Sequence, residues 1–142
     1  MSIFTLMKQI LNHAIWNTHA LLAARILMGT LFIVTGIQKL QGIETIAGYI
    51  GGVGLPMPLV LAWASALFEI VAGVAIITGK YFKEAALLLS AFVVVVSIIF
   101  HNPSGWGADM SQQMMFMKNM AIAAGLLFMA AHGSGDTWKL KI

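Results

Sequence analysis

An acidic residue interrupts one of the most apolar stretches of the sequence. Residues 66–79 are ALFEIVAGVAIITG, in which Glu69 carries the one charge. A carboxylate at the centre of a bilayer costs about 2.5–3.5 kcal/mol on insertion scales, so such a residue faces the protein interior and takes a partner. A charged group in this setting can hold a polar ligand or pass protons along. Glu69 is therefore our candidate for a proton relay.

Two cations have expected depths that allow them to meet Glu69. Arg25 and Lys118 lie toward opposite ends of their segments, each roughly 8–9 Å from Glu69 by helical rise. The sequence leaves open which of the two is the partner, or whether an unpaired Glu69 takes up a proton instead. Lys39 is explained more simply by a side chain that extends toward the lipid head groups.

These residues lie in a chain that is built for a membrane. Of its 142 residues 60% are hydrophobic and only 9% are charged, and the mean hydropathy is +0.91. A soluble domain has roughly a quarter charged residues. Four apolar stretches, at about 20–40, 58–79, 81–100 and 114–131, are long enough to cross a hydrocarbon core of about 30 Å. We therefore expect an all-α integral membrane protein, an antiparallel bundle of four transmembrane helices over residues 20–132.

Small and polar side chains form one stripe on each expected helix. Around Glu69 the stripe contains residues that let another helix approach closely: Ala62, Ser65, Ala66, Ala72 and Gly73. We expect these stripes to converge inside the bundle. The connections 46–58 and 101–113 are predicted to be long loops, whereas the link at residues 80–83 is very short.

The first nineteen residues contain apolar side chains at helical spacing. They include Ile3, Leu6, Met7 and Ile10 and alternate with polar residues such as Lys8. This pattern predicts an amphipathic helix that lies on the membrane surface, with a partly ordered tail as the alternative.

The basic residues predict the orientation. The side with both termini and the short link holds six: Lys8, Arg25, Lys80, Lys83, Lys139 and Lys141. The opposite side holds Lys39 and Lys118. Because cytoplasmic segments carry the excess of Lys and Arg, we expect both termini, including the tail 133–142, in the cytoplasm of a bacterial cell.

Several function classes are excluded or disfavoured by composition. The chain has no cysteine, which excludes disulfides and cysteine-ligated clusters within it. Its net charge of +3 is scattered, which disfavours nucleic-acid binding. His19 and His132 lie at the water boundary, so we do not expect them to hold haem, and we expect no metal site. His101 begins a loop and is a candidate to line the mouth of a pocket.

Four stretches together resemble the DoxX family of small four-helix inner-membrane proteins. They are ARILMGTLFIVTGIQKL from Ala24 to Leu40, FEIVAG around Glu69, FHN after the third stretch, and MFMKNMAIAAGLLF from Met115 to Phe128. The resemblance covers about Ala24 to His132. It implies that Arg25, Lys39, Glu69, Lys118 and Asn119 match polar positions of the family.

Three functions stay open. The first, which the resemblance implies, is the membrane subunit or anchor of a quinone-linked redox system, with quinone as a bound rather than intrinsic cofactor and an oxidoreductase as partner. The chain would then be a quinone-binding or non-catalytic subunit rather than an enzyme by itself. The second is a ligand-free scaffold that recruits a partner protein. The third is a small transporter or proton pathway through Glu69, which four short helices could form only as a homo-oligomer.

Overall fold

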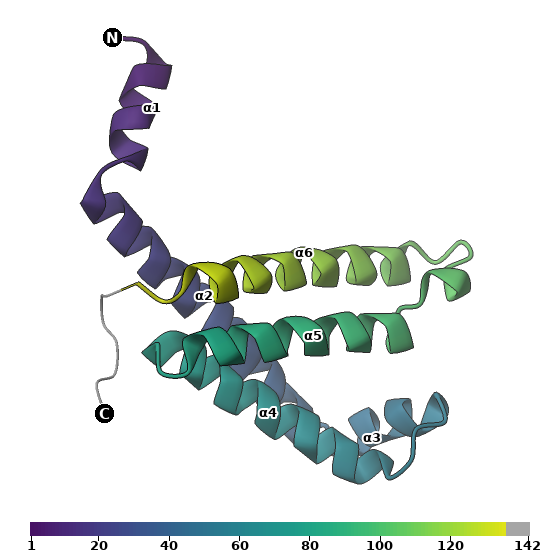
Figure 1. Ribbon diagram of the computed structural model, residues 1–142. Helices are drawn as coiled ribbons and strands as arrows, with labels where there is room; N and C mark the ends of the chain where they lie inside the picture. The colour runs from purple at the N-terminus through teal and green to yellow at the C-terminus, as the bar shows by residue number, and fades with distance from the viewer. Residues whose placement is uncertain (136–142) are drawn as a thin grey trace.

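The computed structural model describes residues 1–135, and their secondary structure is helical (Figure 1). The elements are α1 (Ile3–Leu11), α2 (Ala14–Gln41), α3 (Ile43–Gly52), α4 (Pro58–Thr78), α5 (Phe82–Phe100), the 3₁₀ turn η1 (Pro103–Gly105) and α6 (Met110–His132). Within residues 1–135, four helices are long and apolar enough to cross a membrane: α2, α4, α5 and α6. The predicted membrane-spanning architecture is confirmed. The tail from residue 136 onward, with Lys139 and Lys141, lies outside the described residues.

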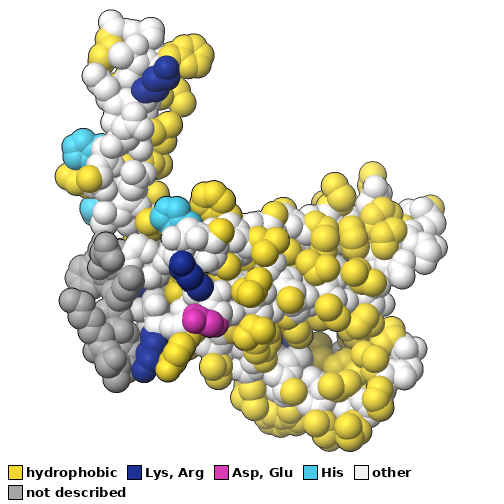
Figure 2. Space-filling view, viewed as in Figure 1, with side chains coloured by type: hydrophobic (Ala, Val, Ile, Leu, Met, Phe, Trp, Pro, Cys, Tyr) yellow, Lys and Arg dark blue, Asp and Glu magenta, His cyan; other side chains and the backbone are white. Residues whose placement is uncertain are grey.

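The spanning helices run alternately in opposite directions and form two closely packed pairs, α2 with α4 and α5 with α6 (Figure 1). The α4–α5 contact joins the pairs. We call the end with the α4–α5 link the turn end, and the end with α3 and η1 the loop end. Figure 2 shows apolar side chains over most of the visible bundle surface, as lipid contact requires.

Glycines allow the backbones of α2 and α4 to touch. A Cβ added to Gly29 would lie 2.6 Å from the carbonyl oxygen of Gly73, and one added to Gly36 would lie 2.8 Å from that of Ala66. Such close approach is the usual role of small residues between membrane helices. The predicted stripe of small residues on α4 is thus largely buried, with Ala62 and Ala66 fully so.

The link between α4 and α5 is as short as predicted. Gly79 ends α4 in the left-handed conformation at φ 78°, and Tyr81 precedes α5 at φ 51°. These two left-handed residues turn the chain back on itself between residues 79 and 81. Gly133, at φ 90°, ends α6 at the same level.

Two sequence-based expectations differ from the structure. Much of the predicted loop 46–58 is the helix α3, whose Ala47 and Ile50 are buried against Ala62 of α4. Its glycines misled the prediction, although they leave the helical hydrogen bonds of α3 intact. The helix of the first predicted span begins at Ala14 instead of about residue 20, and that of the fourth begins at Met110, inside the predicted loop 101–113.

The helix α1 extends away from the bundle (Figure 1). The Ser2 hydroxyl accepts a hydrogen bond from the Thr5 N–H at 3.3 Å and caps the helix. None of its residues is buried, and large apolar side chains such as Phe4 are exposed. Its position on the membrane surface stays a prediction.

Candidate intramembrane polar site

Glu69 pairs with Lys39, not with either of the two expected cations. The Lys39 ammonium lies 2.6 Å from Glu69 Oε1. The hydroxyl of Thr35 donates a hydrogen bond to the other oxygen, Oε2, at 3.0 Å. Glu69 is only 5% exposed, so its carboxylate is buried and bonded at both oxygens by α2.

The direction of the side chains explains the pairing. In a helix every Cα–Cβ bond leans toward the N-terminus. The N-terminus of α2 is at the turn end and that of α4 is at the loop end, so Lys39 and Glu69 lean toward each other. Lys39 therefore reaches into the interface, and the interpretation as a free head-group contact is wrong.

Arg25 has a different role at the turn end. It is 1% exposed and leans away from Glu69. Its Nη2 donates to the Ile77 carbonyl at 2.5 Å and its Nε to the Ile76 carbonyl at 3.3 Å. These carbonyls belong to the last turn of α4, which has no partners within the helix. Its Nη1 reaches the carbonyl of Ser134 at 3.5 Å. Arg25 thus ties α2 to the end of α4 and to the segment after α6.

Lys118 and Asn119 are also separate from the pair. Lys118 is exposed on α6, where its ammonium donates to the Met115 sulfur at 3.3 Å. Asn119 beside it is half-buried. Both expected partners of Glu69, Arg25 and Lys118, are therefore wrong, because Lys39 takes that place.

His101 closes the α5–α6 connection. Its Nδ1 lies 2.6 Å from Gln112 Oε1, and its carbonyl accepts a hydrogen bond from Trp106 Nε1 at 2.9 Å. The Trp106 ring in turn packs edge-on against Phe116. The structure thus brings His101 and Gln112 together as a cap at the loop end.

His19 and His132 engage their own helices. His19 Nδ1 lies 2.7 Å from the Ile15 carbonyl oxygen, and His132 Nδ1 lies 3.3 Å from that of Gly133. The described residues contain no group of three metal-ligating side chains.

Two parts of the site were missed in the sequence. Thr35 lies one helical turn before Lys39, a spacing that places both on one face of α2. Phe92 of α5 has its ring centroid 5.4 Å from the Lys39 ammonium, within range of a cation–π contact. Phe92 also packs edge-on against Phe68, at 5.2 Å between centroids. Only the packing of α4 on α5 brings these rings beside Lys39, so no local sequence pattern marks them.

The site therefore joins three helices around one ion pair. Oxygen acceptors and an ammonium lie in the α2–α4 interface, and two aromatic rings flank them from the α4–α5 contact. The Lys39 side chain is 23% exposed, against 6% for Glu69. Lys39 is thus the more exposed member of the pair.

The family model for DoxX matches residues 20–102. That segment holds Arg25, Thr35, Lys39, Glu69 and Phe92 and is more than half of the chain. The chain belongs to the DoxX family.

Two curated proteins of Escherichia coli strain K12 support the assignment to the DoxX family. The chain is 35% identical to the inner membrane protein YqjF over 117 residues, which are 80% of this chain and 84% of YqjF. It is 30% identical to the inner membrane protein YphA over 117 residues, 81% of this chain and 84% of YphA. No solved structure matches the chain. The chain is thus a DoxX-family protein with four helices that are long and apolar enough to cross a membrane.

Proposed function

We propose that this DoxX-family chain is the membrane-embedded subunit of a quinone-linked redox system and that it binds a quinone head group beside Lys39. The observation that carries the proposal is the partly exposed lysine side chain of an ion pair whose carboxylate is buried. Charged groups within membrane spans are costly and mark ligand or proton sites by default.

The residues around Lys39 fit such a head group chemically. A lysine ammonium has three donors, and Glu69 Oε1 accepts one of them. A quinone carbonyl oxygen could accept another. The ring of Phe92 lies beside the same ammonium and offers an aromatic surface to a flat ring. In this proposal the head group approaches Lys39 from the lipid side.

The division of labour follows from the same residues. The chain has no cysteine to carry electrons, so in this proposal a bound quinone and a partner oxidoreductase carry them. Glu69 would hold or release a proton at its carboxylate, and Thr35 would keep that carboxylate in place. The sequence predicted a wider site that also includes Arg25, His101, Lys118 and Asn119. These four residues lie outside the narrower site beside Lys39.

A ligand-free scaffold is the second candidate, and one observation favours it. Both oxygens of Glu69 are already bonded by Lys39 and Thr35, so the α2–α4 interface is complete without a ligand. In that case the ion pair would fix the register of the two helices, and the partner would bind elsewhere. A proton pathway is the third candidate, in which Glu69→Gln would abolish flux.

The test is the quinone content of protein purified in a mild detergent, measured by an oxidised-minus-reduced ultraviolet spectrum of its organic extract. The informative variant replaces both charges, Lys39→Met with Glu69→Leu, so that no buried charge is left unpaired. Lys118→Met is the matched control, since that ammonium is exposed on α6.

The proposal predicts quinone in the wild type and in the control, and its loss in a folded double variant. Equal quinone in all three proteins would contradict the Lys39 site. If the wild type contains no quinone as purified and also binds none when it is reconstituted with added quinone, the scaffold would be the better explanation of the function.

A further inference from the structure

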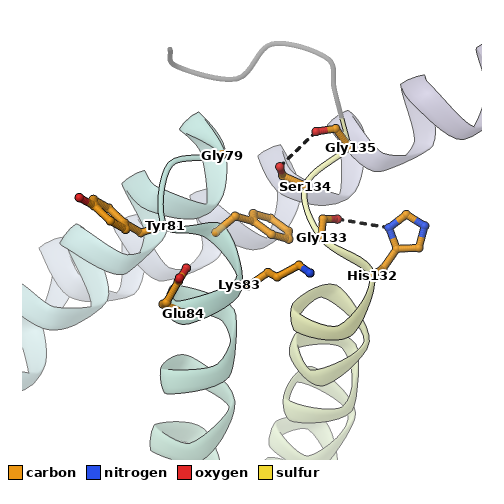
Figure 3. Close-up of a pocket in the computed structure, with 9 residues that line it drawn as sticks. Gly79, Tyr81, Lys83, Glu84, His132, Gly133, Ser134 and Gly135 are labelled. Atoms are coloured by element: carbon orange, nitrogen blue, oxygen red, sulfur yellow. Dashed lines mark hydrogen bonds between the residues drawn. The ribbon is translucent and has the colours of Figure 1, made fainter. Parts of the chain in front are cut away.

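A pocket with polar walls lies at the turn end of the bundle (Figure 3), and neither Lys39 nor Glu69 lines it. It has a volume of about 460 Å³ and lies between the α4–α5 link, the first turn of α5 and residues 132–135. Three spanning helices end or begin here: α4 at Thr78, α5 at Phe82 and α6 at His132. Because the apolar spans end at this level, the pocket lies where the polar head groups of the bilayer begin.

Basic residues from two helices line this pocket, Lys83 of α5 and His132 of α6. Lys83 extends from α5 toward Gly133 and His132 (Figure 3). The next residue, Glu84, also lines the pocket, with its side chain directed away from Lys83. A Cβ added to Gly133 would lie 3.1 Å from Lys83 Cε and 4.0 Å from its ammonium nitrogen. In the part of the chain that the structure describes, this ammonium has no hydrogen-bond acceptor and no carboxylate within bonding distance.

The backbone at the start of α5 adds N–H donors to the pocket, beside the acidic residue Glu84 of the same turn. The helix α5 starts here after Tyr81, and no side chain caps its first N–H groups. The start of a helix carries a partial positive charge and exposes N–H donors. The opposite wall is held in place by Arg25, whose Nη1 donates to the carbonyl of Ser134 at 3.5 Å. A buried arginine thus fixes the segment that faces Lys83.

We infer that this pocket binds a phosphate group, and that the phosphate is that of an anionic phospholipid head group. An ammonium, an imidazole and helix-start N–H groups together match the oxygens of a phosphate, which accept charge-assisted hydrogen bonds. The position at the end of the apolar spans brings lipid phosphates within reach. The glycerol and acyl chains would lie along the exposed apolar surface of α5 and α6.

Lys80 provides a matched control. It lies in the same link and has the same charge, but its ammonium lies over the ring of Tyr81 at 5.4 Å from the centroid, and it does not line the pocket. An attraction due only to the basic surface should weaken equally when either lysine becomes glutamine. A built site should depend on Lys83 alone.

The experiment measures lipid retention by native mass spectrometry of the full-length, delipidated protein titrated with dioleoyl phosphatidylglycerol or dioleoyl phosphatidylcholine. Loss of one charge-assisted hydrogen bond should weaken phosphatidylglycerol binding about tenfold in Lys83→Gln. Lys80→Gln should change it less than about twofold, and Lys83→Arg should keep most of the binding. Thermal melting of each variant in detergent shows whether it is folded.

Two results would overturn the inference. The first is an equal loss of phosphatidylglycerol binding in Lys83→Gln and Lys80→Gln. The second is a wild type that neither prefers phosphatidylglycerol to phosphatidylcholine nor binds inorganic phosphate. Inorganic phosphate is titrated in parallel to identify the source. Competition with the lipid would show that free phosphate occupies the same site, and lack of competition would restrict the site to the lipid. Either result supports a phosphate site, provided that Lys83→Gln removes it.

Discussion

Lys39, near the loop end of α2, and Glu69, at the middle of α4, lean toward each other and meet at 2.6 Å. The contact is possible because the two helices are antiparallel and each side chain leans toward the start of its own helix. Thr35, one turn before Lys39, completes the contact at the second carboxylate oxygen. The pair lies in the α2–α4 interface, where glycines allow the two backbones to touch. The contribution of each residue to the free energy of unfolding can therefore be measured by substitution.

Removal of one partner should cost more than removal of both. Lys39→Met leaves a 5% exposed carboxylate without its cation, and we expect a loss of about 3–5 kcal/mol in the free energy of unfolding. The double variant Lys39→Met with Glu69→Leu should recover most of this loss. Glu69→Gln should cost only about 1 kcal/mol, because the amide oxygen still accepts from Lys39 or Thr35. Unfolding by SDS titration in mixed micelles measures each value, and a Lys39→Met loss no larger than that of Lys118→Met would refute the burial argument.

The close contact of α2 and α4 predicts that one methyl group is harmful at Gly73. A Cβ there would lie 2.7 Å from the Gly29 carbonyl oxygen and 2.9 Å from Ile33 Cγ1, so Gly73→Ala must push the helices apart. We expect a loss of about 1–3 kcal/mol in the free energy of unfolding. The same substitution at Gly125 meets its nearest atom, Met28 Cε, at 3.5 Å and should be nearly neutral. Similar melting temperatures for the two variants would show that the α2–α4 contact is looser than described.

Arg25→Lys should be strongly destabilising although the charge is kept. The guanidinium donates to three carbonyls, those of Ile76, Ile77 and Ser134, and the single ammonium of lysine cannot reproduce this fork. We expect a loss of about 2–3 kcal/mol in the free energy of unfolding. Lys118→Arg, an exchange of cation type at an exposed position, serves as the control. If Arg25→Lys and Lys118→Arg have the same melting temperature, the guanidinium does not stabilise the end of α4.

The orientation can be tested with introduced cysteines, because the chain has none of its own. Asn12 and Ser104 are exposed positions at opposite ends of the bundle. With both termini in the cytoplasm, a membrane-impermeant maleimide added to intact spheroplasts should label Ser104→Cys and leave Asn12→Cys unlabelled. Labelling of Asn12→Cys should appear only after permeabilisation. The opposite pattern would invert the predicted topology.

The sequence predicted the architecture well, because hydrophobic length and small-residue stripes act locally along each helix. The same stripes correctly turned Glu69 toward the protein interior. They could not identify its partner, because helical rise gives the axial depth of a residue but not the lean of its side chain, and that lean separates Lys39 from Arg25. Phe92 was beyond prediction for a different reason: its place beside Lys39 depends on how α5 packs across the bundle.

The order of the two charges along the chain has a consequence for biosynthesis. Lys39 precedes Glu69 by 30 residues, so it leaves the ribosome and enters the membrane first. A lysine near the end of a span can keep its ammonium among the head groups until its partner is inserted. Glu69, at the middle of α4, cannot reach the head groups, and it enters the membrane after its counter-ion and the hydroxyl of Thr35. Insertion from the N-terminus therefore avoids an unpaired carboxylate at the centre of the bilayer, whereas a circularly permuted chain with α4 ahead of α2 would insert Glu69 before Lys39.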